Sequence, residues 1–227
     1  MKLEMHLHTL GNSRCAKVSA EDAAELYRRL GYDGVVVTNH WNEYIANDFF
    51  SDFGDKTAKY LEGYEAMRAT GIRSFFGVEL ALGKDYYSPH NNAGAEILVY
   101  GITPEEFRKE GERLFSVDIR ALRRLADERG WVLVQAHPFR ERTKRLPHEF
   151  LDGAEVFNGN FRHLNKNFIA SAYAKRRFLL PTAGSDFHQP EDAKAGVEFF
   201  GEIKDEKALA EALRQKRYRI FKNIKKL

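Results

Sequence analysis

The sequence contains very little cysteine and proline. Its 227 residues include one cysteine, Cys15, and six prolines. A single thiol excludes a disulfide framework and any zinc site built mainly from thiolates. The scarcity of proline excludes a proline-rich linker that would divide the chain. We therefore expect one domain over residues 1–227, because α/β barrels reach this length as a single unit.

Long apolar runs and an excess of charge of one sign are also absent. The longest apolar runs, such as residues 34–37 (GVVV), are far too short to cross a bilayer, and the first residues lack the apolar segment of a signal peptide. The 36 basic and 33 acidic residues leave a net charge of +3, which excludes a polycationic nucleic-acid coat and an acidic tail. We expect a soluble, cytoplasmic protein that has no membrane partner.

Short apolar runs alternate with amphipathic segments along the whole chain. Their composition and capping residues predict strands and helices in turn. The predicted strands are residues 3–7, 35–38, 73–80, 96–101, 131–135, 153–157, 179–183, 196–200 and 218–221. The predicted helices cover residues 19–30, 56–70, a segment from 103, 119–129, 165–177 and 204–215. This alternation predicts an α/β fold with a parallel sheet, closed or nearly closed into a barrel.

Histidines and carboxylates follow the predicted strands. His6 and His8 close the first strand two residues apart, so both imidazoles face one side of it. Taken alone, such a pair is as well explained by two buried or surface histidines. The other strands, however, end at or just before His40, Glu79, His137, Asp186 and His188. Because a barrel brings these strand ends to one mouth, we predict a shared site for zinc, manganese or iron there.

Four motifs in this order resemble the PHP (polymerase and histidinol phosphatase) family of metal-dependent phosphoesterases. They are His6-Leu7-His8-Thr9, Thr38-Asn39-His40, Ala136-His137-Pro138 and Gly184-Ser185-Asp186-Phe187-His188, with Glu79 in its usual place after the third strand. The resemblance implies a distorted (β/α)7 TIM-like barrel that holds up to three metal ions at the C-terminal mouth of its strands. The implied ligands are His6, His8, His40, Glu79, Glu96, His137, Asp186 and His188. Of these, Glu79, Asp186 and His188 are also the expected catalytic residues.

The chain departs from the family pattern at three positions. Asn39 replaces an aspartate that is not normally a ligand, and Glu96 replaces a histidine but can still bind through oxygen. Arg14 stands where relatives often have a ligand, and a guanidinium cannot bind a cation.

These departures affect the three implied metal positions differently. One would have His6, His8, Glu79 and Asp186 as ligands, and a second would have Glu79, His137 and Glu96. The third would have only His40 and His188, with the charge of Arg14 opposing the ion. We therefore expect two tightly held ions and a third that depends on a bound anion or on the Cys15 thiolate.

The expected reaction is hydrolysis of a phosphate monoester of a small metabolite or nucleotide, as in a histidinol phosphatase. A metal-activated water would attack phosphorus, so neither Ser13 nor Cys15 is needed as a nucleophile. A nuclease or nucleotide bisphosphatase and a non-catalytic metal-binding domain stay open as alternatives. The near-neutral charge and the lack of an aromatic and basic stripe disfavour a long nucleic-acid groove.

The expected substrate contacts lie in loops at the mouth. Arginine binds phosphate oxygens in a bidentate way, and the loop at residues 139–145 is rich in basic residues. A solvated basic loop is the alternative explanation for this run of charge. The candidate contacts are Arg14, His90, Arg140, Arg142 and Asn158.

Overall fold

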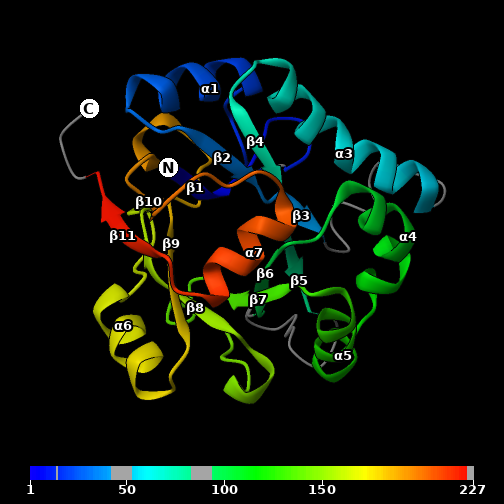
Figure 1. Cartoon of the computed structure of the whole chain (residues 1–227), viewed down its shortest axis with the longest axis vertical. Coiled ribbons are helices and arrows are strands. Elements are labelled where there is room, and N and C mark those ends of the chain that lie inside the picture. Colours follow the sequence, from blue (N-terminus) through cyan, green and yellow to red (C-terminus); the bar gives the residue numbers. More distant parts are fainter. Residues whose placement is uncertain (14, 42–52, 83–93, 224–227) are drawn as a thin grey trace.

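A computed structural model describes residues 1–13, 15–41, 53–82 and 94–223 of the chain. Strands form the centre of the molecule and helices surround them (Figure 1). The strands are β1 (Lys2–Leu7), β2 (Gly34–Val37), β3 (His40–Trp41), β4 (Arg73–Phe76), β5 (Val78–Ala81), β6 (Glu96–Tyr100), β7 (Val132–Gln135), β8 (Gly153–Asn158), β9 (Leu180–Gly184), β10 (Ala195–Phe199) and β11 (Tyr218–Lys222). The α-helices are α1 (Ala20–Arg29), α3 (Phe53–Ala69), α4 (Pro104–Phe115), α5 (Ile119–Arg129), α6 (Asn167–Arg176) and α7 (Glu206–Arg214).

Helix ends follow the capping residues in the sequence. Ser19 precedes α1, and its hydroxyl accepts a hydrogen bond from Asp22 N at 3.1 Å. Thr103 and Glu106 form a complete capping box at the start of α4, where each side chain binds the other residue's backbone N–H. Within the described residues, no helix is both long and apolar enough to cross a membrane.

The α/β class is confirmed, but the strands are neither all parallel nor assigned to one closed sheet. Among the described residues they form a sheet of order β11-β10-β1-β2-β4 and a second of order β3-β5-β6-β7-β8-β9. β6 runs antiparallel to both β5 and β7, and β10 runs antiparallel to β1. Near the site the sheets meet where His8 N donates to Phe187 O at 3.1 Å. The strand directions are therefore mixed rather than all parallel, and the two sheets are not assigned as one closed barrel although backbone hydrogen bonds join them.

The predicted strand 73–80 is in fact two strands that belong to different sheets. β4 ends at Phe76 and β5 begins at Val78, with Gly77 between them. A Cβ atom at Gly77 would lie 2.9 Å from the Thr38 side chain, so a larger residue here would displace that side chain. An apolar run continuous in sequence therefore joins the two sheets.

Apolar side chains form an inner and an outer core. Leu3, Leu98 and Val132 lie in an inner cluster, which also contains Leu209 and Leu213 of α7. Side chains that alternate with these along the strands form the outer cluster with the surrounding helices. Figure 1 shows α7 lying across the strands, and Arg214 Nη2 donates to Trp131 O just before β7 begins. Helix α7 thus closes the end of the strands opposite the polar mouth.

The first strand carries a bulge at its histidines. Met5 belongs to the inner cluster and Leu7 to the outer one, and the pairing of β1 with β2 shifts register between Glu4 and Leu7. Glu4 Oε1 accepts a hydrogen bond from His6 N at 2.8 Å, which holds the irregular segment. The bulge breaks the strict alternation of side chains along β1. His6 and His8 can therefore both contact Glu79 at the mouth, although Met5 between Glu4 and His6 also faces inward.

Candidate metal centre

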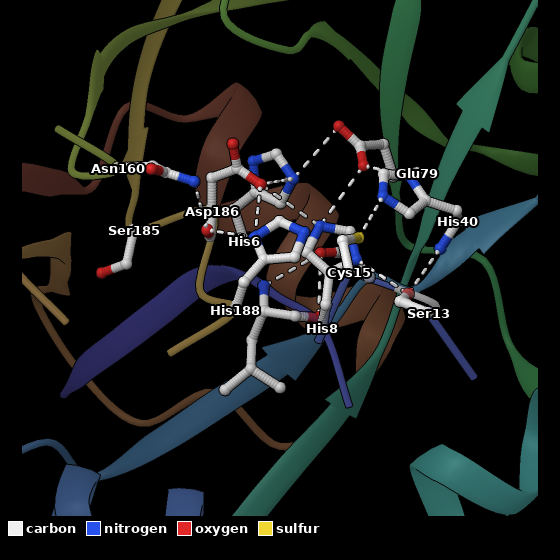
Figure 2. A network of polar contacts seen from close by, with 12 residues as sticks. His6, His8, Ser13, Cys15, His40, Glu79, Asn160, Ser185, Asp186 and His188 are labelled. Carbon is white, nitrogen blue, oxygen red and sulfur yellow. Dashed lines mark hydrogen bonds and ion pairs between the residues drawn. The ribbon is translucent and has the colours of Figure 1, made fainter. Parts of the chain in front are cut away.

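Glu79 is the hub of the polar cluster at the mouth (Figure 2). Its Oε1 lies 3.1 Å from His6 Nε2 and 3.3 Å from His137 Nε2. Its Oε2 lies 3.3 Å from His8 Nε2 and 2.7 Å from His40 Nδ1. Four imidazoles from the end of β1, from β3 and from the segment after β7 thus surround one buried carboxylate, as the convergence of strand ends predicts.

Asp186 forms the other acidic contact of the cluster. Its Oδ1 lies 3.6 Å from His6 Nε2 and 3.4 Å from His8 Nε2. Asp186 follows β9 with a φ of +48°, a left-handed conformation that non-glycine residues seldom adopt. Such strain is retained where the surrounding structure holds it, and it often occurs at functional sites. Here it accompanies the placement of a carboxylate between two histidines.

Glu96 reaches the mouth from the beginning of a strand rather than from its end. Because β6 runs antiparallel to its neighbours, its first residue lies where theirs finish. Glu96 Oε1 lies 3.6 Å from His40 Nδ1, and Oε2 lies 3.3 Å from His137 Nε2. The reversed strand therefore brings a third carboxylate to the cluster.

In each of three histidines, a hydrogen bond fixes the Nδ1 atom of the ring. His6 Nδ1 lies 3.0 Å from Glu155 Oε1, His8 Nδ1 lies 3.1 Å from Ser13 Oγ, and His188 Nδ1 lies 2.7 Å from the Asp186 carbonyl oxygen. The carbonyl can only accept, so His188 Nδ1 carries the proton; an ionised Glu155 requires the same of His6. The Nε2 lone pairs are then available for a metal ion, in the arrangement that metal-binding histidines usually have.

The donors present fit a metal ion. His6 Nε2, His8 Nε2, His40 Nδ1 and Glu79 Oε2 are buried without a hydrogen-bond partner among the described residues. Buried polar atoms are normally satisfied, and a cation is the partner that lone pairs of this kind accept. The donor atoms of each of three groups lie within 4.8 Å of one another: His6, His8 and Asp186; His40, Glu79 and Glu96; and His8, His40 and His188.

These groups overlap with the three expected positions but do not coincide with them. The first contains most of the predicted set, with Glu79 close by. The second group contains His40, which is not among the expected ligands of that position, and the third group likewise contains His8 in addition to the expected pair. His137 lies within ion-pair distance of both glutamates of the second group.

The charges of the cluster shift the pKa values of its members. Burial lowers the pKa of His6, but Glu79, Glu155 and Asp186 outweigh it and raise that pKa well above its usual value. Burial raises the pKa of Asp186, but Arg140 and His6 hold it well below its usual range. Burial and the neighbouring Glu79 raise the pKa of Glu96. Without an ion, the cluster thus stores protons on imidazoles, which an incoming cation would displace.

Arg140 lies at the edge of the cluster and contacts Asp186. Its Nη2 donates to Asp186 Oδ2 and, at 3.2 Å, to Asn158 Oδ1. Its Nε donates to Asn165 Oδ1 at 2.8 Å. Two of the predicted substrate contacts, Arg140 and Asn158, are thus brought together beside the predicted ligands.

The other predicted contacts are an exposed arginine and two residues outside the described part of the chain. Arg142 is exposed in the loop after β7, and its side chain is not among the described contacts of the centre. Arg14 and His90 lie outside the described residues.

Buried residues that the sequence analysis did not single out support the centre. Glu155 binds His6 Nδ1 and accepts from His137 N at 2.9 Å, and Glu4 Oε1 accepts from Ser185 N at 2.8 Å. Each is the only acidic residue of its strand and has apolar residues on both sides, and this is the signal that could have identified them.

The sequence places no base next to Cys15, but the fold brings a histidine close to it. Its Sγ lies 3.4 Å from His40 Nε2. Burial raises the pKa of the thiol, but hydrogen bonds with His188 and His40 lower it to about 6.

Comparisons with known proteins agree with this architecture. Residues 165–218 match a family model described as PHP-associated. The fold is similar to that of a two-domain protein from Bacteroides vulgatus that contains a predicted PHP-like metal-dependent phosphoesterase, with a TM-score of 0.66 and 19% identity over 97% of this chain. The resemblance to the PHP family is confirmed. This chain spans 64% of the length of the PHP-like protein from B. vulgatus.

Other solved structures have a similar fold. A proposed metal-dependent phosphoesterase from Bifidobacterium adolescentis has a TM-score of 0.52 and 18% identity, over 93% of this chain and 95% of that one. An amidohydrolase from Chromobacterium violaceum, with bound sulfate and no metal, has a TM-score of 0.54 and 17% identity, over 96% of this chain and 98% of that one. No curated protein matches the sequence significantly.

Proposed function

We propose that this protein is a metal-dependent phosphoesterase that hydrolyses a phosphate monoester of a small metabolite or nucleotide. The observation that carries the proposal is the convergence of five histidines and three carboxylates, several of them buried with unpartnered lone pairs. Divalent ions held there would lower the pKa of a coordinated water and polarise the oxygens of a phosphate. Imidazole and carboxylate donors together suit manganese, zinc or iron.

Arg140 supports a phosphate ester as the substrate. Its guanidinium is 15% exposed and is oriented by Asn158 and Asn165, so its position is set before a substrate arrives. A planar guanidinium matches two oxygens of a phosphate, and a phosphate could share the donors that now meet Asp186. Arg140 would therefore bind and orient the phosphoryl group at the edge of the metal centre.

The loop after β8, whose asparagines bind the Arg140 side chain, is itself hydrogen-bonded to Asp186. Asn160 Nδ2 donates to the Asp186 carbonyl oxygen at 3.3 Å, and Asn165 Nδ2 donates to Asn158 Oδ1 at 3.0 Å. These amides tie the substrate-binding side of the site to the metal-binding side. Preorganisation of this kind lowers the reorganisation required in the transition state.

A phosphate-release assay tests the proposal. The metal-free protein is incubated with manganese, zinc or iron and with an aryl phosphate, sugar phosphates, histidinol phosphate, nucleotides and short oligonucleotides. We expect phosphate release from at least one monoester, abolished by a chelator and by Asp186→Asn. Cleavage of oligonucleotides alone would favour a nuclease, and binding of metal without any hydrolysis would favour a non-catalytic domain.

A further inference from the structure

Cys15 lies at the solvent-facing side of the metal centre, beside histidines that donate to an ion. Its thiol is exposed, and Sγ lies 3.4 Å from His40 Nε2. Figure 2 shows the sulfur among the imidazoles of the cluster. The ring of His8 stacks against those of His40 and His188, at centroid distances of 4.3 and 4.4 Å. One sulfur and three imidazoles are thus grouped on this side of the centre.

The distance between the two donors has the value expected for ligands of one ion. Zinc binds thiolate sulfur at about 2.3 Å and imidazole nitrogen at about 2.0–2.1 Å, so two such donors at a tetrahedral angle are about 3.6 Å apart. The observed separation of 3.4 Å between Cys15 Sγ and His40 Nε2 needs only a small adjustment.

The neighbouring imidazoles point independently to a ligand at this position. His8, His40 and His188 have donor atoms within 4.8 Å of one another. His8 is fully buried, and its Nε2 has no hydrogen-bond partner in the part of the chain that the structure describes. The close contacts of His8 Nε2 are with the carboxylates of Glu79 and Asp186, at 3.3 and 3.4 Å, and neither is a hydrogen bond. A cation held between the imidazoles and the thiol would accept the lone pair that hydrogen bonding leaves free.

We infer that Cys15 supplies a thiolate ligand to an ion held by His40 and His188, with His8 beside it. This inference rests on the metal centre of the proposed function and specifies the chemistry of its third position. A thiolate donor favours zinc, iron or cobalt over magnesium and calcium, which prefer oxygen. The thiolate supplies the donor that Arg14 cannot, so the ion needs no bound phosphate to complete its ligands.

The reactivity of the thiol measures this contact directly, because Cys15 is the only cysteine in the chain. In the test, a thiolate attacks the disulfide of an aromatic disulfide reagent, and the coloured aromatic thiolate leaves. We expect zinc to slow the modification at least about tenfold, since a coordinated sulfur is no longer free to attack. Magnesium should leave the rate unchanged. Equal rates with zinc and without metal, or equal protection by both metals, would overturn the inference.

Cobalt spectra and metal counts provide a second measurement that does not depend on activity. The cobalt-loaded protein should show a near-ultraviolet thiolate charge-transfer band, which Cys15→Ser removes together with one zinc equivalent. Cys15→Asp, which offers an oxygen donor of similar reach, should restore the zinc equivalent but not the band. A wild-type spectrum without the band would contradict the inference alone, whereas a wild-type protein that binds no metal would contradict the proposed function as well.

Discussion

Glu155 Oε1 lies 3.0 Å from Nδ1 of His6, and both side chains are completely buried. The second oxygen of Glu155 accepts from His137 N at 2.9 Å and from Asn158 Nδ2 at 2.8 Å. One carboxylate therefore orients a metal-binding imidazole, the backbone of a second one, and an amide that holds Arg140. Glu155, which is not among the expected metal ligands, thus positions His6, His137 and Asn158.

Removing the charge of Glu155 should weaken metal binding. In Glu155→Gln the neutral amide holds the proton of His6 Nδ1 less strongly, and we expect metal affinity to fall about 10–100-fold. Zinc titration calorimetry measures the change. Glu202→Gln is a matched control, since Glu202 is an exposed partner of Arg73. Equal affinities in both variants would show that Glu155 does not position the ligand.

Replacing Asp186 should reduce turnover far more than it reduces substrate binding. Asp186→Asn keeps the shape of the side chain but removes the charge beside His6 and His8, and we expect kcat to fall by about two orders of magnitude or more. Steady-state phosphate release at saturating metal separates kcat from KM. A variant that retains the wild-type kcat would show that the metal centre lies elsewhere.

Arg140 and Arg142 form a natural pair for testing phosphate binding. Arg140 contacts Asp186 and Asn158, whereas Arg142 is exposed two residues further along the loop. The sequence alone assigns substrate contacts to both, and the structure favours Arg140. Arg140→Ala should raise KM about tenfold or more, through loss of a charge-assisted bidentate contact, while Arg142→Ala should change it little. The opposite ranking would place the substrate on the outer part of the loop.

Metal binding should become tighter as the pH rises. The pKa values of His6 and His40 are raised well above 6.5, because the attraction of neighbouring carboxylates outweighs the effect of burial. In the metal-free protein, the stability they contribute is fully present below about pH 6.5 and is lost as the pH rises through the raised pKa values. A bound ion requires neutral imidazoles, so it gains affinity over the same interval.

Thermal unfolding with manganese and with a chelator tests whether metal affinity increases with pH. The Tm difference between the two samples should widen from about pH 6 to about pH 9. A constant or narrowing difference would show that these imidazoles do not exchange protons for metal.

Much of the fold and of the ligand set could be predicted from the sequence. The apolar runs that end in His8, His40, Glu79, His137 and Asp186 locate the strands and also the mouth, because strand ends converge in this type of fold. These assignments depend on local patterns, namely alternation within a strand and the residue that follows it. The caps at Ser19 and Thr103 are equally local and are found where predicted.

Features that depend on pairing between distant segments could not be predicted. The sequence of β6 does not reveal whether the strand runs parallel or antiparallel to its neighbours. Its antiparallel direction is nevertheless what places Glu96 at the mouth. The Glu4 carboxylate beside the bulge accepts hydrogen bonds from Ser185 N, far along the chain, and from the Tyr27 hydroxyl on α1. The approach of Cys15 to His40 likewise arises only in the folded chain, 25 residues apart in sequence.

The closure of the inner core by α7 has a consequence for how the chain is made. Leu209 and Leu213 complete a cluster that contains Leu3 and Met5, and β1 pairs with β10. During synthesis, the first strand therefore leaves the ribosome long before the residues that bury it. β2 can pair with it early, but the part of its apolar face that β10 and α7 cover must wait until those residues have emerged, and contacts of such long sequence separation form slowly. The metal centre, whose donors extend from residue 6 to residue 188, can then assemble only near the end of folding.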